Sequence, residues 1–162
     1  MKNYKRLIFL DIDGVLTTWK AYGRIDTECI RRLNKLKDIG AEIVISSSWG
    51  YDSGRTEKTL IGCGLELKII GYTQHYYEEW ICRGNEIEQW LNENMGKYAG
   101  IGGTLVFLMG LNALPGIADS LIAGGMPPET PAAVISQGAS AFQKKVCDRL
   151  DRIADTAVRE KC

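Results

Sequence analysis

The sequence has no excess of charge of either sign. Its 162 residues carry 20 basic and 20 acidic side chains, which cancel. A chain without net charge generates no overall field that would draw it to a nucleic-acid backbone or an anionic membrane surface. This balance excludes an avid, non-specific polyanion binder, although a local basic patch is compatible with it.

The chain has few histidines, and its cysteines do not have the spacing of common metal or redox sites. The single histidine, His75, has no foreseeable carboxylate partner, so we assign it no catalytic role. The cysteines are odd in number and lack a C-x-x-C pair or metal-binding spacing, which favours free thiols in a reducing cytoplasm. They are Cys29, Cys63, Cys82, Cys147 and Cys162.

No apolar run is long enough to span a membrane. The nearest candidate, residues 101–122, is interrupted by glycines and by Asn112, Pro115 and Asp119. The N-terminal residues 1–6 are polar and lead directly into an apolar run, so we expect no signal peptide. These features predict a cytoplasmic protein without a membrane partner.

Charge almost disappears in the middle of the chain. Residues 99–143 contain only Asp119 and Glu129, and a glycine-rich stretch precedes them. Such a shift indicates either a deeply buried block or a segment of different origin. We therefore expect three parts, which are 1–98, a junction at 99–103, and 104–162.

Strand-like and helix-like patterns alternate along the chain, which favours an α/β fold with a mainly parallel sheet flanked by helices. The first expected strand ends at Leu10. The other expected strands cover 41–45, 65–70, 104–109 and 132–136. The expected helices cover 26–39, 56–61, 84–94, 114–123 and 142–158. The last one is predicted from an apolar stripe formed by Phe142, Val146, Leu150, Ile153 and Ala157.

Two carboxylates follow the first strand. Asp11 and Asp13 flank Ile12, directly after the apolar run 7–10, and Gly14 permits a tight turn. Ligands of open α/β sheets bind at this carboxyl end of the strands. A carboxylate at Asp11 is suited to attack phosphorus, and one at Asp13 to transfer protons. The alternative is a surface turn with two solvated acids.

Two later segments supply groups that bind phosphate. Ser46 and Ser47 follow the second strand, where their hydroxyls are suited to bind a phosphoryl oxygen, or alternatively to cap a turn or helix. Arg83 begins a helix, where its guanidinium would hold phosphate and offset negative charge. The alternative for Arg83 is an ordinary exposed residue of the first turn.

Together these motifs resemble the haloacid dehalogenase (HAD) superfamily of phosphohydrolases, and more narrowly the small HAD domains associated with RNA-repair proteins. The resemblance covers residues 1–98 and rests on four segments, 9–15, 43–49, 69–71 and 83–87. It implies a Rossmann-like fold with Asp11 as nucleophile and Asp13 as acid and base. It also implies Ser46 or Ser47 and Arg83 as phosphate ligands, and Mg²⁺ held at Asp11 and Asp13.

The spacing between Asp13 and Ser46 leaves no room for an inserted cap domain. A capless site stays open, which suits a bulky phosphorylated substrate such as a nucleic-acid end or a phosphoprotein. Aromatic residues crowd the segment before Arg83, where they would stack on bases or, alternatively, pack over the sheet edge. They are Tyr72, Tyr76, Tyr77 and Trp80.

One element of the HAD pattern is missing. Members of the superfamily have a further acidic motif after the next strand, which holds Mg²⁺, whereas the 104–109 strand here ends in Gly110-Leu111-Asn112. The first acid beyond it is Asp119, which we expect inside a helix. The missing carboxylate predicts weakened Mg²⁺ binding and an impaired phosphohydrolase.

Residues 103–138, and more weakly the chain to 158, resemble the C-terminal domain of tetrapyrrole methylases such as uroporphyrinogen-III C-methyltransferase. The resemblance implies that Met109 and Ala133 line half of an S-adenosylmethionine pocket. The N-terminal domain that completes that pocket has no counterpart in residues 1–98. The sequence thus leaves three hypotheses: a Mg²⁺-dependent phosphohydrolase, an S-adenosylmethionine-binding module, or an inactive chimeric α/β protein.

Overall fold

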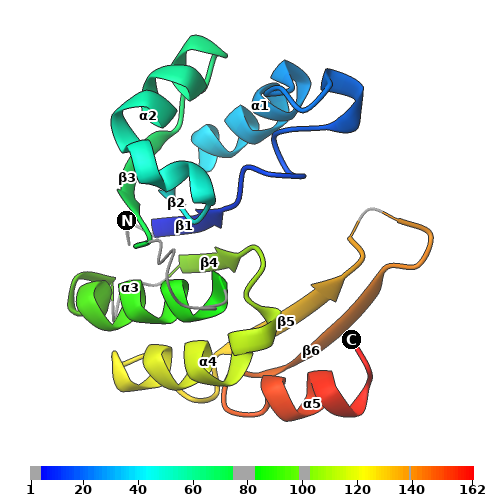
Figure 1. Cartoon of the computed structure of the whole chain (residues 1–162). Helices are drawn as coiled ribbons and strands as arrows, with labels where there is room; N and C mark the ends of the chain where they lie inside the picture. The colour runs from blue at the N-terminus through cyan, green and yellow to red at the C-terminus, as the bar shows by residue number, and fades with distance from the viewer. Residues whose placement is uncertain (1–4, 75–82, 99–102, 139) are drawn as a thin grey trace.

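The protein is built around a four-stranded parallel sheet. A computed structural model describes residues 5–74, 83–98, 103–138 and 140–162 (Figure 1). The strand order is β3-β2-β1-β4, and every neighbouring pair is parallel. The strands are β1 (Lys5–Leu10), β2 (Ala41–Ile45), β3 (Lys68–Tyr72) and β4 (Gly103–Phe107). The α/β class expected from the alternating pattern is confirmed.

Helices cover both faces of the sheet (Figure 1). The pleat of β1 sends Leu7 and Phe9 to one face and Ile8 and Leu10 to the other, and each pair enters a separate apolar cluster. Both sides of β1 are therefore buried, as a run of four apolar residues requires. The helices on the first face are α3 (Arg83–Tyr98) and α4 (Leu114–Ala123), and those on the second are α1 (Thr27–Asn34) and α2 (Ser53–Gly62).

Local capping explains where the first helical segment begins and ends. The Asp26 carboxylate accepts a hydrogen bond from the Glu28 N–H, which satisfies a donor that the start of α1 leaves free. The segment continues as the 3-10 helix η2 (Lys35–Ile39) and ends at Gly40, whose φ of 72° is left-handed. The predicted helix over 26–39 is confirmed as this pair of elements.

The predicted helix over 142–158 is wrong. The structure has β6 (Lys144–Arg149), which pairs antiparallel with β5 (Pro131–Ser136) in a separate hairpin, followed by the short helix α5 (Ile153–Arg159). Phe142, expected inside the apolar stripe, is exposed. The apolar residues of a strand, a turn and a helix happen to lie at helical spacing over these 17 residues. Pairing with β5 makes the first part a strand rather than a helix.

The β4 strand belongs to the same sheet as β1. Its register runs from Lys5 opposite Gly103 to Phe9 opposite Phe107, and the Leu108 N–H extends the pairing by donating to the Phe9 carbonyl at 3.2 Å. The segment that follows the glycine-rich stretch therefore supplies an edge strand to the sheet of the first hundred residues. Among the described residues, no helix is both long enough and apolar enough to cross a membrane.

Gly84 allows α3 to approach the segment after β4 closely. A Cβ added at Gly84 would lie 2.3 Å from Ala113 Cβ in the 3-10 helix η4 (Leu111–Ala113). Because that distance is impossible, we expect Gly84→Ala to push the two elements apart and lower the free energy of unfolding by about 1–3 kcal/mol. Urea denaturation measures this difference.

Gly62→Ala is the matched control for this substitution. Gly62 is also helical, but a Cβ there meets nothing within 4 Å. Alanine should raise stability at this position by about 0.4–1 kcal/mol, because it restricts the unfolded chain. Equal effects of the two substitutions would contradict the close packing of α3 against η4.

Candidate functional site

A row of buried polar residues crosses the carboxyl edge of the sheet. Asp11, Ser46 and Thr73 each lie one residue beyond the last registered position of β1, β2 and β3. Two backbone hydrogen bonds extend the ladder to them: Ser46 N–H to the Leu10 carbonyl at 2.8 Å, and Thr73 N–H to the Ile45 carbonyl at 2.9 Å. Pairing of the strands thus places residues far apart in sequence side by side.

Asp11 is a buried carboxylate without a cation among the described residues. It is 7% exposed, and its Oδ1 accepts a hydrogen bond from the Ile12 N–H at 2.8 Å. No ion pair to Asp11 is found in the described ranges. An anion taken out of water without a partner costs free energy. A cation or an electrophilic phosphorus bound at this position would offset that cost.

The turn after Asp11 is held by its own backbone. The N–H groups of Val15, Leu16 and Thr17 all donate to the Ile12 carbonyl. Gly14 has a φ of 73°, which favours glycine, and its N–H donates to Thr17 Oγ1 at 3.1 Å. The turn is thus fixed, and the next acid takes a defined place beside it.

Asp13 is oriented by the segment after β2. Its Oδ2 accepts a hydrogen bond from Ser48 Oγ at 3.1 Å, and its Oδ1 accepts one from Trp49 Nε1 at 3.0 Å. Ser48 and Trp49 begin the 3-10 helix η3 (Ser48–Asp52). The first two strands therefore contribute jointly to the position of this carboxylate. The sequence contained these two donors in the 43–49 segment, but no signal assigned them to Asp13.

The two serines after β2 have different surroundings. Ser47 caps η3 by accepting from the Trp49 N–H at 3.5 Å, so the capping alternative applies to it. Ser46 is fully buried, and its hydroxyl has no hydrogen-bond partner in the described part of the chain. Of the two, Ser46 therefore has the hydroxyl that a ligand can engage.

The cation predicted to bind phosphate, Arg83, lies at the start of α3. Arg83 is the first residue of α3, but its side chain lies outside the described residues, as do His75, Tyr76, Tyr77 and Trp80. Glu86, in the first turn of α3, is a second buried carboxylate, which the sequence analysis did not single out. Its only sequence signal was its place three residues after Arg83.

The segment that follows β4, residues 108–112, contains no acid. The β1–β4 register ends at Phe107, the chain bends after it, and Met109 has a left-handed φ of 64° and a side chain 66% exposed. Asp119, the nearest later acid, is exposed on α4. Across the described ranges, no three acidic, histidine or cysteine side chains converge as a metal site.

Mg²⁺ fits these residues only in part. It prefers oxygen ligands, often one or two carboxylates together with phosphate oxygens and water. Asp11 offers a buried carboxylate that has no cation beside it among the residues the structure describes. Both carboxylate oxygens of Asp13, by contrast, already accept hydrogen bonds. Each of these oxygens keeps a further lone pair, so Asp13 remains the proposed second ligand, in an orientation set by Ser48 and Trp49.

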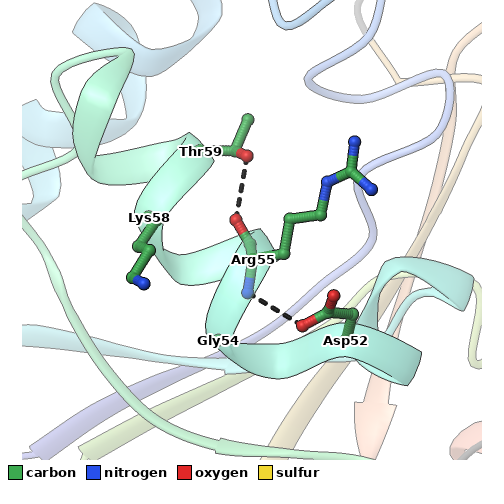
Figure 2. A pocket seen from close by; sticks show the side chains of 5 residues that line it. All are labelled: Asp52, Gly54, Arg55, Lys58 and Thr59. Atoms are coloured by element: carbon green, nitrogen blue, oxygen red, sulfur yellow. Dashed lines mark hydrogen bonds between the residues drawn. The ribbon is translucent and has the colours of Figure 1, made fainter.

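A shallow, solvent-exposed hollow of about 510 Å³ lies beside the start of α2 (Figure 2). Two hydrogen bonds hold the backbone that lines it: the Asp52 carboxylate accepts one from the Arg55 N–H, and the Thr59 hydroxyl donates one to the Arg55 carbonyl. The Arg55 and Lys58 side chains project in different directions, and neither has a carboxylate partner in the described residues (Figure 2). Since α2 follows η3 directly, this basic surface lies near the segment that orients Asp13.

The two residues expected at an S-adenosylmethionine pocket belong to different parts of the fold. Met109 follows β4 of the parallel sheet, whereas Ala133 lies in β5 of the hairpin. Both are exposed. The arrangement thus presents two separated surface positions.

Comparison with known proteins identifies two regions. Residues 7–101 match a family described as the HAD domain in Swiss Army Knife RNA repair proteins. A shorter stretch is similar to siroheme synthases: it is 46% identical over 50 residues to siroheme synthase 2 of Klebsiella pneumoniae, and 49% identical over 51 residues to the enzyme of Hahella chejuensis. These stretches cover 31% and 32% of the chain, but only 11% of each synthase. The chain therefore spans about a tenth of those relatives.

Proposed function

The chain belongs, through residues 7–101, to the family of HAD domains in Swiss Army Knife RNA repair proteins, and from this we propose that it is a phosphomonoester hydrolase. The observation that carries the proposal is the buried Asp11 carboxylate beside the buried Ser46 hydroxyl, neither of which has a side-chain partner among the described residues. A nucleophile and a hydrogen-bond donor for the phosphoryl group are thereby present at the edge of the sheet where ligands bind.

The reaction we propose has two steps. A carboxylate oxygen of Asp11 forms a bond to phosphorus while the bond from phosphorus to the leaving oxygen breaks, and Asp13 gives that oxygen a proton. Asp13 then takes a proton from water, whose oxygen attacks phosphorus, releases inorganic phosphate and restores the Asp11 carboxylate. Ser48 and Trp49 hold Asp13 in place for both transfers.

Mg²⁺ is the cofactor that we propose, held by the Asp11 and Asp13 carboxylates. When bound, it would neutralise negative charge on the phosphoryl oxygens. Because residues 110–112 after β4 contain no acid to add a further ligand, we expect weak binding and a requirement for high Mg²⁺ concentrations. Ser46 supplies a donor that does not depend on the metal, and the proposed Arg83 guanidinium would supply positive charge.

A nucleic-acid end is the substrate class that we favour. The loop between Asp13 and α1 presents Trp19, 83% exposed, and Tyr22, 93% exposed, together with Lys20 and Arg24. Aromatic faces that stack on bases, next to cations that pair with phosphates, are the usual means of binding single strands.

Removing both loop aromatics, Trp19 and Tyr22, should weaken the binding of large substrates but not of small ones. We expect the double variant Trp19→Ala, Tyr22→Ala to raise KM for a 3′-phosphorylated oligonucleotide about tenfold or more, because each stacked base contributes about 1–3 kcal/mol. Its kinetics on an aryl phosphate should not change. Steady-state phosphate release measures both values.

Phe142→Ala is the control for this double variant. It removes an aromatic side chain that is 77% exposed but lies in the connection between β5 and β6, which form a separate sheet. It should leave KM unchanged for both substrates. An equal rise in KM for the aryl phosphate and the oligonucleotide in the double variant would contradict base stacking.

The proposal as a whole is tested by phosphate release from an aryl phosphate and from a 3′-phosphorylated oligonucleotide, with and without Mg²⁺. The wild type must exceed the same protein carrying Asp11→Asn. If the wild type releases no phosphate above that variant, the phosphohydrolase proposal is wrong. Cys29, Cys63, Cys147 and Cys162 are free thiols, in keeping with the cytoplasmic setting that we propose.

The similarity to siroheme synthases supports a second candidate, a module that binds S-adenosylmethionine. Its proposed contacts are Met109 and Ala133. A rise in melting temperature with S-adenosylmethionine, lost in Met109→Ala, would favour it. No signal with that ligand and no phosphate release would together favour an inactive chimeric α/β protein.

A further inference from the structure

We propose that Thr73 binds a phosphoryl oxygen together with Ser46, so that the two hydroxyls form one anion-binding site beside Asp11. Thr73 has no part in the motifs that suggested a phosphohydrolase. The inference deepens the proposed function, on which its choice of ligand rests. Its physical basis is that both hydroxyls are buried and unused.

The hydroxyls of Ser46 and Thr73 are unusual among the described buried polar side chains because they make no hydrogen bond. Ser46 is 0% exposed and Thr73 is 4% exposed, and among the described residues neither side-chain oxygen has a hydrogen-bond partner. A buried hydroxyl without a partner costs about 1–3 kcal/mol, so folded proteins seldom keep one without a function. Two such groups on neighbouring strands indicate a ligand that supplies the missing acceptors.

The sheet register places both hydroxyls in one row with Asp11. Leu10, Ile45 and Tyr72 are paired across β1, β2 and β3, and their side chains contribute to the cluster beneath α1 and α2. The next residue on each strand points to the opposite face, because side chains alternate along a strand. Asp11, Ser46 and Thr73 therefore project towards the α3 side.

A β-bulge in β3 produces this alignment. The register runs from Ile43 opposite Ile69 to Val44 opposite Gly71, so Ile70 is the extra residue. Without it, Tyr72 would occupy the row next to Ser46, and Thr73 would lie beyond it. Bulges next to active sites commonly re-aim a side chain. Here the bulge brings a small hydroxyl residue to the edge where Asp11 and Ser46 already lie.

The chemistry of the row favours a phosphoryl group over water. A phosphoryl group offers several strong acceptors at once, and an adjacent nucleophile fixes which oxygens face the hydroxyls. A single bridging water would also satisfy both groups. The two possibilities predict opposite changes in the stability of the ligand-free protein. Removing a hydroxyl that has no partner there raises stability, whereas removing one that binds a structural water lowers it.

Thr73→Val tests this, because valine keeps the shape and removes the hydroxyl. We expect the melting temperature of the ligand-free protein to rise by about 2–4 °C, the shift that corresponds to one unsatisfied hydroxyl in a chain of this length. In the same protein, the Kd for inorganic phosphate should rise about tenfold, since a hydrogen bond to a charged group is lost. Calorimetry measures both quantities.

Thr73→Ser and Ser46→Ala complete the design. Thr73→Ser keeps the hydroxyl and should retain the phosphate affinity, and Ser46→Ala should weaken it as Thr73→Val does. A fall in melting temperature, or a failure to fold, in Thr73→Val would overturn the inference in favour of a structural hydroxyl or water. So would an unchanged phosphate Kd, or a Thr73→Ser protein that no longer binds phosphate.

The experiment separates this inference from the proposed function. If the wild type binds phosphate through Thr73 but releases none from a monoester, the anion site stands and the phosphohydrolase fails. If the wild type hydrolyses the monoester and Thr73→Val does so with unchanged KM and kcat, the hydrolase stands and the role of Thr73 is wrong.

Discussion

Asp11→Asn is expected to lower kcat for phosphate release by about 10³-fold or more, because the amide cannot form the covalent intermediate. The same change should raise the melting temperature, since it removes a buried charge that has no cation among the described residues. Catalytic residues often oppose stability in this way, and a loss of activity combined with a gain in stability would distinguish Asp11 from a structural acid. Phosphate-release kinetics and calorimetry measure the two effects.

Asp119→Asn is the matched control for Asp11. It makes the same acid-to-amide change at an exposed position on α4, where the change should leave kcat, Mg²⁺ dependence and stability unaltered. Activity retained in Asp11→Asn would contradict the proposed nucleophile. A loss of Mg²⁺ dependence in Asp119→Asn would instead show that this acid reaches the metal.

Met109→Asp should strengthen Mg²⁺ binding by about one order of magnitude or more. Met109 follows β4, the neighbour of β1 in the sheet, so an aspartate there would add a further carboxylate at the edge where β1 delivers Asp11. Its φ of 64° also suits the change, because aspartate tolerates the left-handed region better than methionine does. Isothermal titration with Mg²⁺, and the Mg²⁺ concentration giving half-maximal phosphate release, measure the gain.

Met109→Asn separates charge from backbone conformation. Asparagine also tolerates a positive φ but adds no charge, so it should leave Mg²⁺ affinity near that of the wild type. If Met109→Asp and Met109→Asn behave alike, the carboxylate does not reach the metal and the proposed weak point of the site lies elsewhere.

The parts of the fold that could be predicted are those with strong local signals. The apolar run 7–10 and the acids behind it placed β1 and its turn, because a strand buried on both faces cannot be polar. Asp26 and Gly40 located the ends of a helical segment through capping. These signals depend on residues close to one another in sequence.

The remaining features depend on pairing between distant segments. The third strand was predicted at 65–70 but covers 68–72, and the bulge at Ile70 arises only when β3 meets β2. Thr73 was therefore not recognisable from its neighbours. The Trp49 contact to Asp13 and the hairpin that replaces the predicted helix over 142–158 likewise come from tertiary contacts.

The place of β4 has a consequence for how the chain folds. β1 is an inner strand whose second neighbour is about 100 residues away, since Lys5 is opposite Gly103. Pairings this distant must overcome a large loop-closure entropy, and parallel ones form slowly. During synthesis β1 can be enclosed on both edges only after β4 has emerged, so until then one edge of β1 is open to other chains. Folding of the region that matches the repair family thus waits for a segment outside that match.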